Sequence, residues 1–280
     1  MKNKVAIVRV WGGIGNQLFI YAFAKLLSLR YHIPVFLEKR TGFTNDGYHR
    51  KYKLNRFNIS IETVAIYYTL FPLVNKKNVL KKIIFPNVVL FEEDLSNALV
   101  QIPMDFFSGF SKSVIYFQGY WQSLNFKDIR NELLNDLAFY VESRPDFSFY
   151  KEKIEASANS VAIHFRRIEY NFLLSLDYYQ EAIKYFCNNT VSPDFYIFSD
   201  DIEWCKKNND TSKYNFCFIE NFEDELYELK LMSLCSNFII ANSTFSWWGA
   251  WLSNNENKIV IMPEGYINIS MNGQIVFLEG

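Results

Sequence analysis

The second half of the sequence alternates between short apolar runs and longer amphipathic stretches, and this alternation restricts the fold more than any other feature. Runs rich in Val, Ile and Phe predict strands that are buried on both faces, and the stretches between them have a helical period. The predicted strands are 161–165, 195–199, 216–219, 238–241 and 259–262, and the predicted helices are 177–187, 201–207, 223–235 and 244–252. Such repetition predicts a parallel sheet with helices on both faces.

The first 40 residues show the same pattern once. An apolar run at 5–10 predicts a strand, a glycine-rich turn follows, and a helical pattern continues to Pro34, where a second strand begins. This is a βαβ unit with a right-handed crossover. Residues 40–150 have no clear period. Near residue 150, Ser, Ala, Asn and charged residues replace aromatic ones, so we predict two α/β domains, 1–150 and 151–280, that face each other.

Charge and hydropathy exclude several classes of protein. The 29 Lys and Arg residues against 30 Asp and Glu residues exclude binding to nucleic acid through bulk positive charge. The longest weakly polar stretch, 64–74, is too short for a membrane span of about 20 residues, so we expect a cytoplasmic protein. The basic stretch 67–85 can form an amphipathic helix that touches anionic lipid. Pro72 favours a solvated basic face instead, and weak attachment to the inner face of the membrane stays the alternative.

Polar residues follow three of the predicted strands in the second half. They are His164, Arg166 and Arg167 at the first strand, Ser199, Asp200 and Asp201 at the second, and Asn242, Ser243 and Thr244 at the fourth. The carboxyl ends of parallel strands share one edge of a sheet, so these residues are expected to lie together. Arginine binds phosphate bidentately, and a helix N-terminus holds an anion. We predict that both guanidinium groups and the 244–252 helix start hold one pyrophosphate without a metal ion, and that Asp200 or Asp201 binds a base or ribose.

Each of these features also has a purely structural interpretation. The arginine pair can form surface ion pairs, the aspartate pair and the Ser243-Thr244 pair can cap helices, and His164 can be a hydrogen-bonded core residue. The tryptophans of the 244–252 helix favour packing over sugar stacking. An oxidoreductase also stays open, since Glu38 after the second strand can bind a ribose. However, Leu18 stands where the third glycine of a dinucleotide fingerprint would be.

Four segments in order along the chain resemble the motifs of the family 11 glycosyltransferases, the α-1,2-fucosyltransferases. They are GGIGNQLF at 12–19 followed by Tyr21-Ala22, HFRRIEY at 164–170, FSDD at 198–201 with Trp204, and LKLM at 229–232 continuing to ANSTFSWWGAWL at 241–252. The HFRRIEY and STFSWW segments are the specific ones, and the others support them.

The resemblance implies a GT-B-like arrangement of two Rossmann-like domains, with an acceptor-side first domain and a donor-binding second domain. It implies GDP-β-L-fucose as donor, a galactose-terminated oligosaccharide or glycolipid as acceptor, inversion at the anomeric carbon, and no metal or other cofactor. A role in surface-glycan synthesis is expected. By position in the motifs, the donor-binding residues are Gly15, Asn16, Gln17, Arg166, Arg167, Asp200, Asp201, Asn242, Ser243 and Thr244.

The catalytic residues implied in the same way are Arg166, Glu169 and His164. Arg166 would stabilise the leaving diphosphate, and Glu169 and His164 are alternative bases. Glu169 departs from the Asp of the family motif, and Ile168 replaces its usual Gly. The longer side chain moves the carboxylate outward, and about 1 Å matters at a reacting centre. A transferase for another nucleotide sugar and a non-catalytic carbohydrate-binding protein remain alternatives.

Overall fold

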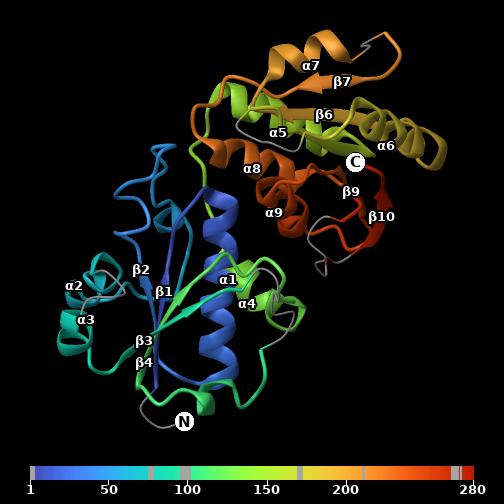
Figure 1. The fold of residues 1–280 in the computed structure, drawn as a ribbon. Coiled ribbons are helices and arrows are strands. Elements are labelled where there is room, and N and C mark those ends of the chain that lie inside the picture. Colours follow the sequence, from blue (N-terminus) through green and yellow to red (C-terminus); the bar gives the residue numbers. More distant parts are fainter. Residues whose placement is uncertain are drawn as a thin grey trace. The chain divides into compact units, whose positions relative to one another are not determined.

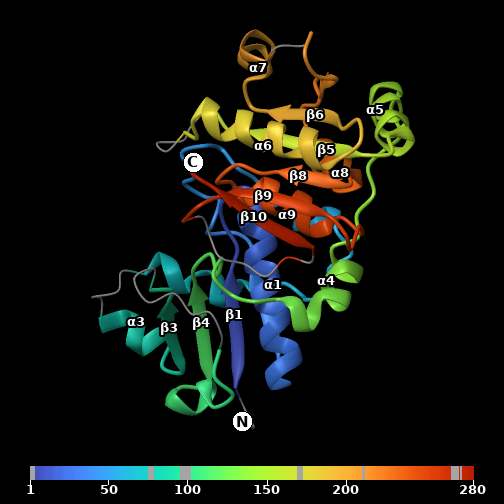
Figure 2. The same ribbon diagram turned by 90° about the vertical axis from the view of Figure 1, so that its right-hand side faces the viewer.

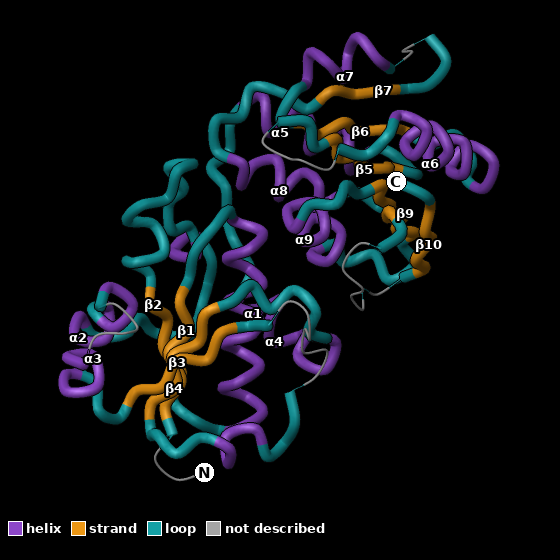
Figure 3. The backbone as a smooth tube through the Cα atoms, in the orientation of Figure 1, coloured by secondary structure: helices purple, strands orange, loops and turns teal. Residues whose placement is uncertain are grey.

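A computed structural model describes residues 4–74, 79–94, 102–168, 173–209, 212–265, 271 and 273–280. The chain divides into two compact units, Met1–Tyr140 and Val141–Gly280, and each unit has its own parallel sheet (Figures 1 and 3). The predicted boundary at 150 would cut the helix α5 (Pro145–Ala156), all of which belongs to the second unit. The tertiary division therefore comes about ten residues earlier than the change in composition.

The first unit is built on a four-stranded parallel sheet in the order β2-β1-β4-β3. Its strands are β1 (Val5–Arg9), β2 (Val35–Glu38), β3 (Val88–Glu92) and β4 (Val114–Gln118), and its helices are α1 (Ile14–Tyr31), α2 (Ile66–Thr69), α3 (Val79–Ile84) and α4 (Arg130–Asp136). The predicted βαβ start is confirmed, whereas β3 and β4 come from the region that gave no prediction. Figure 2 shows α1 alongside β1.

The helix α1 ends where the sequence predicts. His32 takes a left-handed backbone conformation with φ of 52°, and its N–H donates to the carbonyl of Ser28. Such a C-cap satisfies a free carbonyl of the last turn, and Pro34 then prevents the helix from continuing. The chain is thereby turned into β2, which pairs in parallel with β1.

The second unit is built on a six-stranded parallel sheet in the order β10-β9-β8-β5-β6-β7. Its strands are β5 (Ser160–Phe165), β6 (Asp194–Ser199), β7 (Phe216–Phe218), β8 (Asn237–Ile239), β9 (Ile259–Pro263) and β10 (Gln274–Leu278). Its helices after α5 are α6 (Leu176–Asn189), α7 (Ile202–Asn208), α8 (Glu225–Leu234) and α9 (Thr244–Leu252). The five predicted strands and four predicted helices are confirmed to within two residues at each end, whereas α5 and β10 were not predicted.

The helices of the second unit lie on both faces of the sheet. Right-handed crossovers place α6 and α7 on one face, and α8 and α9 on the other, where α8 packs against both α5 and α9. The tryptophans of α9 are buried, which confirms that they pack rather than stack on sugars. Gly249 permits this packing, since a Cβ there would lie 2.2 Å from the Sδ of Met232 in α8.

No helix in the described ranges is both long enough and apolar enough to cross a membrane.

Candidate functional site

The end of β5 directs neighbouring side chains to opposite faces of the second sheet. The ring of His164 lies 5.5 Å from that of Phe245 in α9, whereas the ring of Phe165 stacks 4.0 Å from that of Tyr179 in α6. Arg166 and Arg167 directly follow the end of β5.

Asp200 connects the ends of β5 and β6. Its Oδ2 lies 3.1 Å from the Nη1 of Arg166, and its carboxylate accepts hydrogen bonds from the backbone N–H groups of Arg167 (2.7 Å) and Ile168 (3.1 Å). The predicted meeting of these two strand ends is therefore confirmed. Asp200 holds the backbone of Arg167 and Ile168 in place, while Asp201 caps α7 by accepting from the N–H of Trp204 at 3.0 Å.

The two guanidinium groups have different partners. The guanidinium carbon of Arg167 lies 3.8 Å from the ring centroid of Trp204, and the buried Nε of Arg167 has no hydrogen-bond partner among the described residues. Arg166 pairs with Asp200 instead. The prediction that both arginines hold one pyrophosphate together stays a prediction, with Asp200 in contact with the side chain of Arg166 and the backbone N–H of Arg167. A donor-binding role for each arginine separately stays a prediction.

His164 is buried and uncharged. Burial, together with the nearby charge of Arg166, lowers its pKa to about 3. Its Nδ1 is buried without a hydrogen-bond partner in the part of the chain that the structure describes. In a histidine that serves only as a hydrogen-bonded core residue, this nitrogen would have a hydrogen-bond partner. The neutral ring is a weak proton acceptor near neutral pH.

The start of α9 leaves one side chain unused by the helix. Ser243 occupies the N-cap position with φ of −136° and ψ of 127°, but its hydroxyl makes no capping hydrogen bond. The hydroxyl of Ser246 donates to the carbonyl of Ser243 at 3.1 Å. The capping interpretation of Ser243 is therefore wrong. Phosphate binding by Asn242, Ser243 and Thr244 stays a prediction, supported by the N–H groups that a helix start presents.

Glu228 in α8 is a titratable residue that the sequence analysis missed. It is half-buried, and burial, then the nearby charges of Glu225 and Asp200, raise its pKa to about 7. A carboxyl group that titrates near neutrality is typical of functional sites. The only signal in the sequence is an acid between Tyr227 and Leu229, directly before the LKLM segment.

The glycine-rich turn of the first unit follows the carboxyl end of β1. Gly12 has a φ of +79°, a left-handed backbone conformation that residues with a Cβ rarely adopt. The Oδ1 of Asn16 accepts a hydrogen bond from the Nε2 of Gln122 at 2.8 Å. Gly15 is buried in the first turn of α1. Contact between this turn and a donor stays a prediction.

Gln17 is engaged entirely within the first unit. Its side chain is buried, and its Nε2 donates to the carbonyls of Gly12 (2.9 Å) and Lys51 (2.8 Å). Its Oε1 accepts from the N–H of Lys53 at 2.9 Å. The amide therefore joins the glycine turn to residues 51–53. Binding of the nucleotide-sugar donor by Gln17 stays a prediction. Both polar atoms of its amide already have partners within the first unit, so the structure does not support it.

Glu38 is the acid on which the oxidoreductase alternative depends, and it is fully buried. Its Oε1 accepts from the backbone N–H groups of Arg40 (2.7 Å) and Thr41 (3.1 Å), and its Oε2 accepts from the hydroxyl of Tyr116 (3.1 Å) and from that of Thr41. A carboxylate with four internal donors has no capacity for a ribose. The interpretation of Glu38 as a ribose-binding acid is therefore wrong.

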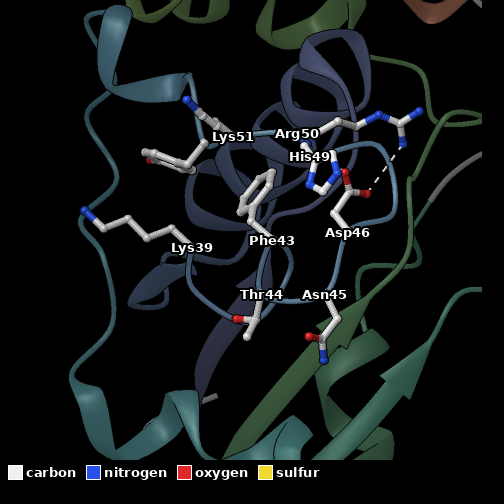
Figure 4. Close-up of a pocket in the computed structure, with 9 residues that line it drawn as sticks. Lys39, Phe43, Thr44, Asn45, Asp46, His49, Arg50 and Lys51 are labelled. Carbon is white, nitrogen blue, oxygen red and sulfur yellow. Dashed lines mark hydrogen bonds and ion pairs between the residues drawn. The ribbon is translucent and has the colours of Figure 1, made fainter.

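The loop after β2 forms a cavity of about 660 Å³ in the first unit, a size typical of sites for small ligands. Its lining residues are Lys39, Phe43, Thr44, Asn45, Asp46, His49, Arg50, Lys51 and Tyr52. Figure 4 shows Phe43 at the centre of these side chains, between Lys39 and the ion pair of Arg50 with Asp46. The buried hydroxyl of Tyr52 has no hydrogen-bond partner in the described ranges. This cavity could not be predicted from the sequence, because its residues come from a loop without a helical or strand period.

Within the described ranges, no three His, Cys, Asp or Glu side chains lie together as a metal site would need, and independence from metal stays a prediction. Glu169 lies outside the described residues.

Comparison with known proteins gives matches over nearly the whole chain. The family model described as "Glycosyl transferase family 11" matches residues 5–271. The O-antigen biosynthesis glycosyltransferase WbnK of Escherichia coli is 30% identical, over 90% of this chain and 91% of the relative. The alpha-1,2-colitosyltransferase of Escherichia coli is also 30% identical, over 93% of this chain and 91% of the relative.

Solved structures share the fold at low sequence identity. Fucosyltransferase NodZ from Bradyrhizobium matches with a TM-score of 0.52 and 11% identity, over 90% of this chain and 94% of that chain. A variant of Arabidopsis thaliana FUT1 in complex with GDP matches with a TM-score of 0.55 and 10% identity, over 95% of this chain and 72% of that chain. These matches confirm the predicted fold class, a GT-B-like α/β protein with two Rossmann-like units.

Proposed function

Since the chain belongs to glycosyltransferase family 11, we propose that it transfers L-fucose from GDP-β-L-fucose to the 2-hydroxyl group of a galactoside. The observation that carries this proposal is the contact of Arg166 with Asp200 at the carboxyl edge of the second sheet. Ligands of open parallel sheets bind at this edge. The names of the relatives support a sugar donor and a role in surface-glycan synthesis.

The proposed reaction is a single displacement with inversion. The acceptor oxygen forms a bond to the anomeric carbon of fucose as the bond from that carbon to the GDP oxygen breaks. The bonding electrons leave with GDP, and the hydroxyl proton passes to a base. Arg166 and the N–H groups at the start of α9 would stabilise the charge that develops on the diphosphate.

Glu169 is the base that we propose. His164 is a poor alternative, because its pKa of about 3 leaves little tendency to accept a proton. We therefore assign to His164 a role in binding or orienting the donor with its neutral ring. An unchanged dependence of rate on pH in Glu169→Gln would contradict the assignment of the base.

We place the acceptor at the cavity of the first unit. Phe43 and Tyr52 provide aromatic surface, and the surrounding cationic and amide side chains provide hydrogen-bond donors for hydroxyl groups. Phe43→Ala should raise the KM for the acceptor by about tenfold and leave the KM for the donor unchanged, as expected when one aromatic contact is lost. Phe149→Ala, which changes an exposed Phe of the second unit, is the control. Equal effects on both KM values would contradict this placement.

One experiment tests the transfer itself. The protein is incubated with GDP-fucose and a panel of galactosides, with and without a chelator, and GDP and product are detected by mass spectrometry. We expect both products in both conditions, and an α anomeric configuration by NMR. No GDP release with any acceptor would overturn the proposal.

Transfer of colitose is the second candidate, because a colitosyltransferase is among the relatives of similar length. A parallel reaction with nucleotide-activated colitose distinguishes the two sugars. A site that hydrogen-bonds the 3-hydroxyl group, which colitose lacks, would prefer fucose strongly. A preference for colitose would replace the first candidate within the same family.

A further inference from the structure

The short helices α2 and α3 and the 3₁₀ turn between them, Phe71–Leu73, expose an unusual number of large apolar side chains. We call these residues the apolar patch: Ile66 (65% exposed), Tyr67 (46%), Leu70 (47%), Leu73 (63%), Leu80 (55%), Ile83 (67%) and Ile84 (43%). Single exposed apolar residues scattered over a surface are normal, but seven within 19 residues form a cluster that needs an explanation. Figure 1 shows α2 and α3 together beside the first sheet.

The apolar patch forms one surface. Ile66, Leu70 and Leu73 are spaced for one face of a helical segment, and Leu80, Ile83 and Ile84 are spaced for one face of α3. Tyr67 joins the two groups, since its hydroxyl donates to the carbonyl of Ile84 and its ring lies 4.9 Å from that of Phe85.

The first unit does not need these side chains for its own core. The inward side of the same segment is already occupied by Phe71 and Phe85, which are 3% and 2% exposed. Their rings lie 5.4 Å apart, and that of Phe71 lies 5.0 Å from the ring of Tyr116 in β4. The segment is therefore anchored on the sheet by one side and presents its other apolar side outward.

The segment that carries the apolar patch has charges of a single sign. The sequence from 63 to 91 contains Lys76, Lys77, Lys81 and Lys82 and no Asp or Glu. In the structure, the ammonium of Lys81 lies 3.9 Å from the ring centroid of Phe71, and Lys82 is exposed. A patch that combines apolar side chains with only positive charges is complementary to a partner that is both apolar and anionic.

We propose that the apolar patch docks on an anionic lipid bilayer. Its aliphatic side chains would enter the boundary between headgroups and acyl chains, Tyr67 would lie at headgroup level, and the exposed Lys82 would face lipid phosphates. A second copy of the chain fits less well, because a two-fold interface sets the same patch against itself and would bring lysine against lysine. The inference does not rest on the proposed transfer reaction.

Vesicle flotation tests the proposal with the full chain. The vesicles consist of phosphatidylcholine alone or mixed with phosphatidylglycerol. We expect the protein to float with the mixed vesicles and weakly or not at all with the neutral ones. A variant with Ile66→Ser, Leu73→Ser and Ile83→Ser should bind the mixed vesicles at least about tenfold more weakly, because three apolar side chains no longer leave water.

The matched control replaces three exposed apolar residues of the second unit, Phe149→Ser, Val191→Ser and Phe277→Ser, and should bind like the unchanged protein. Lys82→Glu tests the charge separately and should weaken binding to the mixed vesicles at least about fivefold. Transfer to a soluble galactoside should be equal in the unchanged protein and the patch variant, so failure of the transferase proposal would be seen separately.

Three results would overturn the proposal. One is no flotation with the mixed vesicles, and another is equal flotation with both kinds. The third is a dimer in sedimentation velocity that the patch variant abolishes while vesicle binding is absent, which would assign the apolar patch to a second copy.

Discussion

Arg166 and Asp200 show how the site depends on single side chains. Asp200 accepts from one guanidinium and two backbone N–H groups, so it fixes both the backbone at Arg167 and Ile168 and the position of the Arg166 charge. Because the backbone donors remain when Arg166 is replaced, the effect of a substitution there should report on catalysis rather than on folding.

We expect Arg166→Ala to lower kcat/KM by about 10²–10³, the usual cost of removing one preorganised donor from a developing charge. Arg166→Lys should recover little of this loss, since an ammonium cannot replace a planar fork. Steady-state kinetics with GDP-fucose measure both. Arg144→Lys, which changes an exposed arginine paired with Asp146, is the control. A full-rate Arg166→Ala enzyme would remove Arg166 from the mechanism.

Glu228 should make stability depend on pH. The pKa of Glu228 is about 7 in the folded protein and its ordinary value is 4.5, so the carboxyl group stays protonated to a higher pH in the folded protein than in the unfolded chain. Stability should therefore fall as pH rises from about 4.5 to 7, by at most about 3 kcal/mol. Glu228→Gln should remove this loss, so its Tm relative to the unchanged protein should be higher at about pH 8 than at about pH 5.

The control for this experiment is Glu223→Gln, which changes an exposed acid just before α8. Its relative Tm should be the same at both pH values. A constant relative Tm for Glu228→Gln as well would show that Glu228 ionises as freely in the folded protein as in the unfolded chain.

Side-chain direction was the hardest property of the site to predict. The sequence showed that Arg166, Asp200 and the start of α9 share an edge, because parallel strands end together. It did not show that Asp200 would hold a neighbouring loop while Asp201 caps a helix, because two adjacent acids have the same local propensity. Glu228 was missed for a related reason, since only the tertiary fold shows what an acid on a helix faces.

At the scale of elements, α8 and α9 are held together by a close approach at Gly249. Gly249→Ala should destabilise the protein by about 1–3 kcal/mol, because the new Cβ would displace Met232 in a packed core. Thermal or urea unfolding measures the change. Gly109→Ala is the control, since a Cβ there would meet nothing within 4 Å. An equally small effect at both glycines would show that Met232 moves aside freely.

Helices and strands could be predicted where the spacing of apolar residues changes clearly from one element to the next, and not where it stays uniform. In the second unit, each strand is separated from its helix by polar residues, and the predictions followed those changes. β3 follows α3 after only three residues, Phe85-Pro86-Asn87, and the apolar residues on the two sides of this turn show no distinct helical or strand period. β10 was missed because it is an edge strand whose residues are exposed or half-buried.

At the scale of the whole molecule, each unit has a complete sheet and its own buried residues. We expect residues 141–280 expressed alone to unfold cooperatively and to bind GDP detectably, because Arg166, Asp200 and the start of α9 all lie in this unit. Calorimetry measures both properties. Arg166→Ala in the same fragment should remove the binding. A folded fragment without affinity for GDP would show that the first unit supplies essential donor contacts.

The buried amide of Gln17 has a mechanical consequence for the first unit. It hydrogen-bonds the backbone of Gly12 on one side and that of Lys51 and Lys53 on the other. The glycine turn and the wall of the cavity are therefore constrained to shift as one piece. A sugar that displaces the cavity wall would therefore also displace the turn next to Asn16. A carboxylate in place of the Gln17 amide would lose both N–H donors and uncouple the glycine turn from the cavity wall.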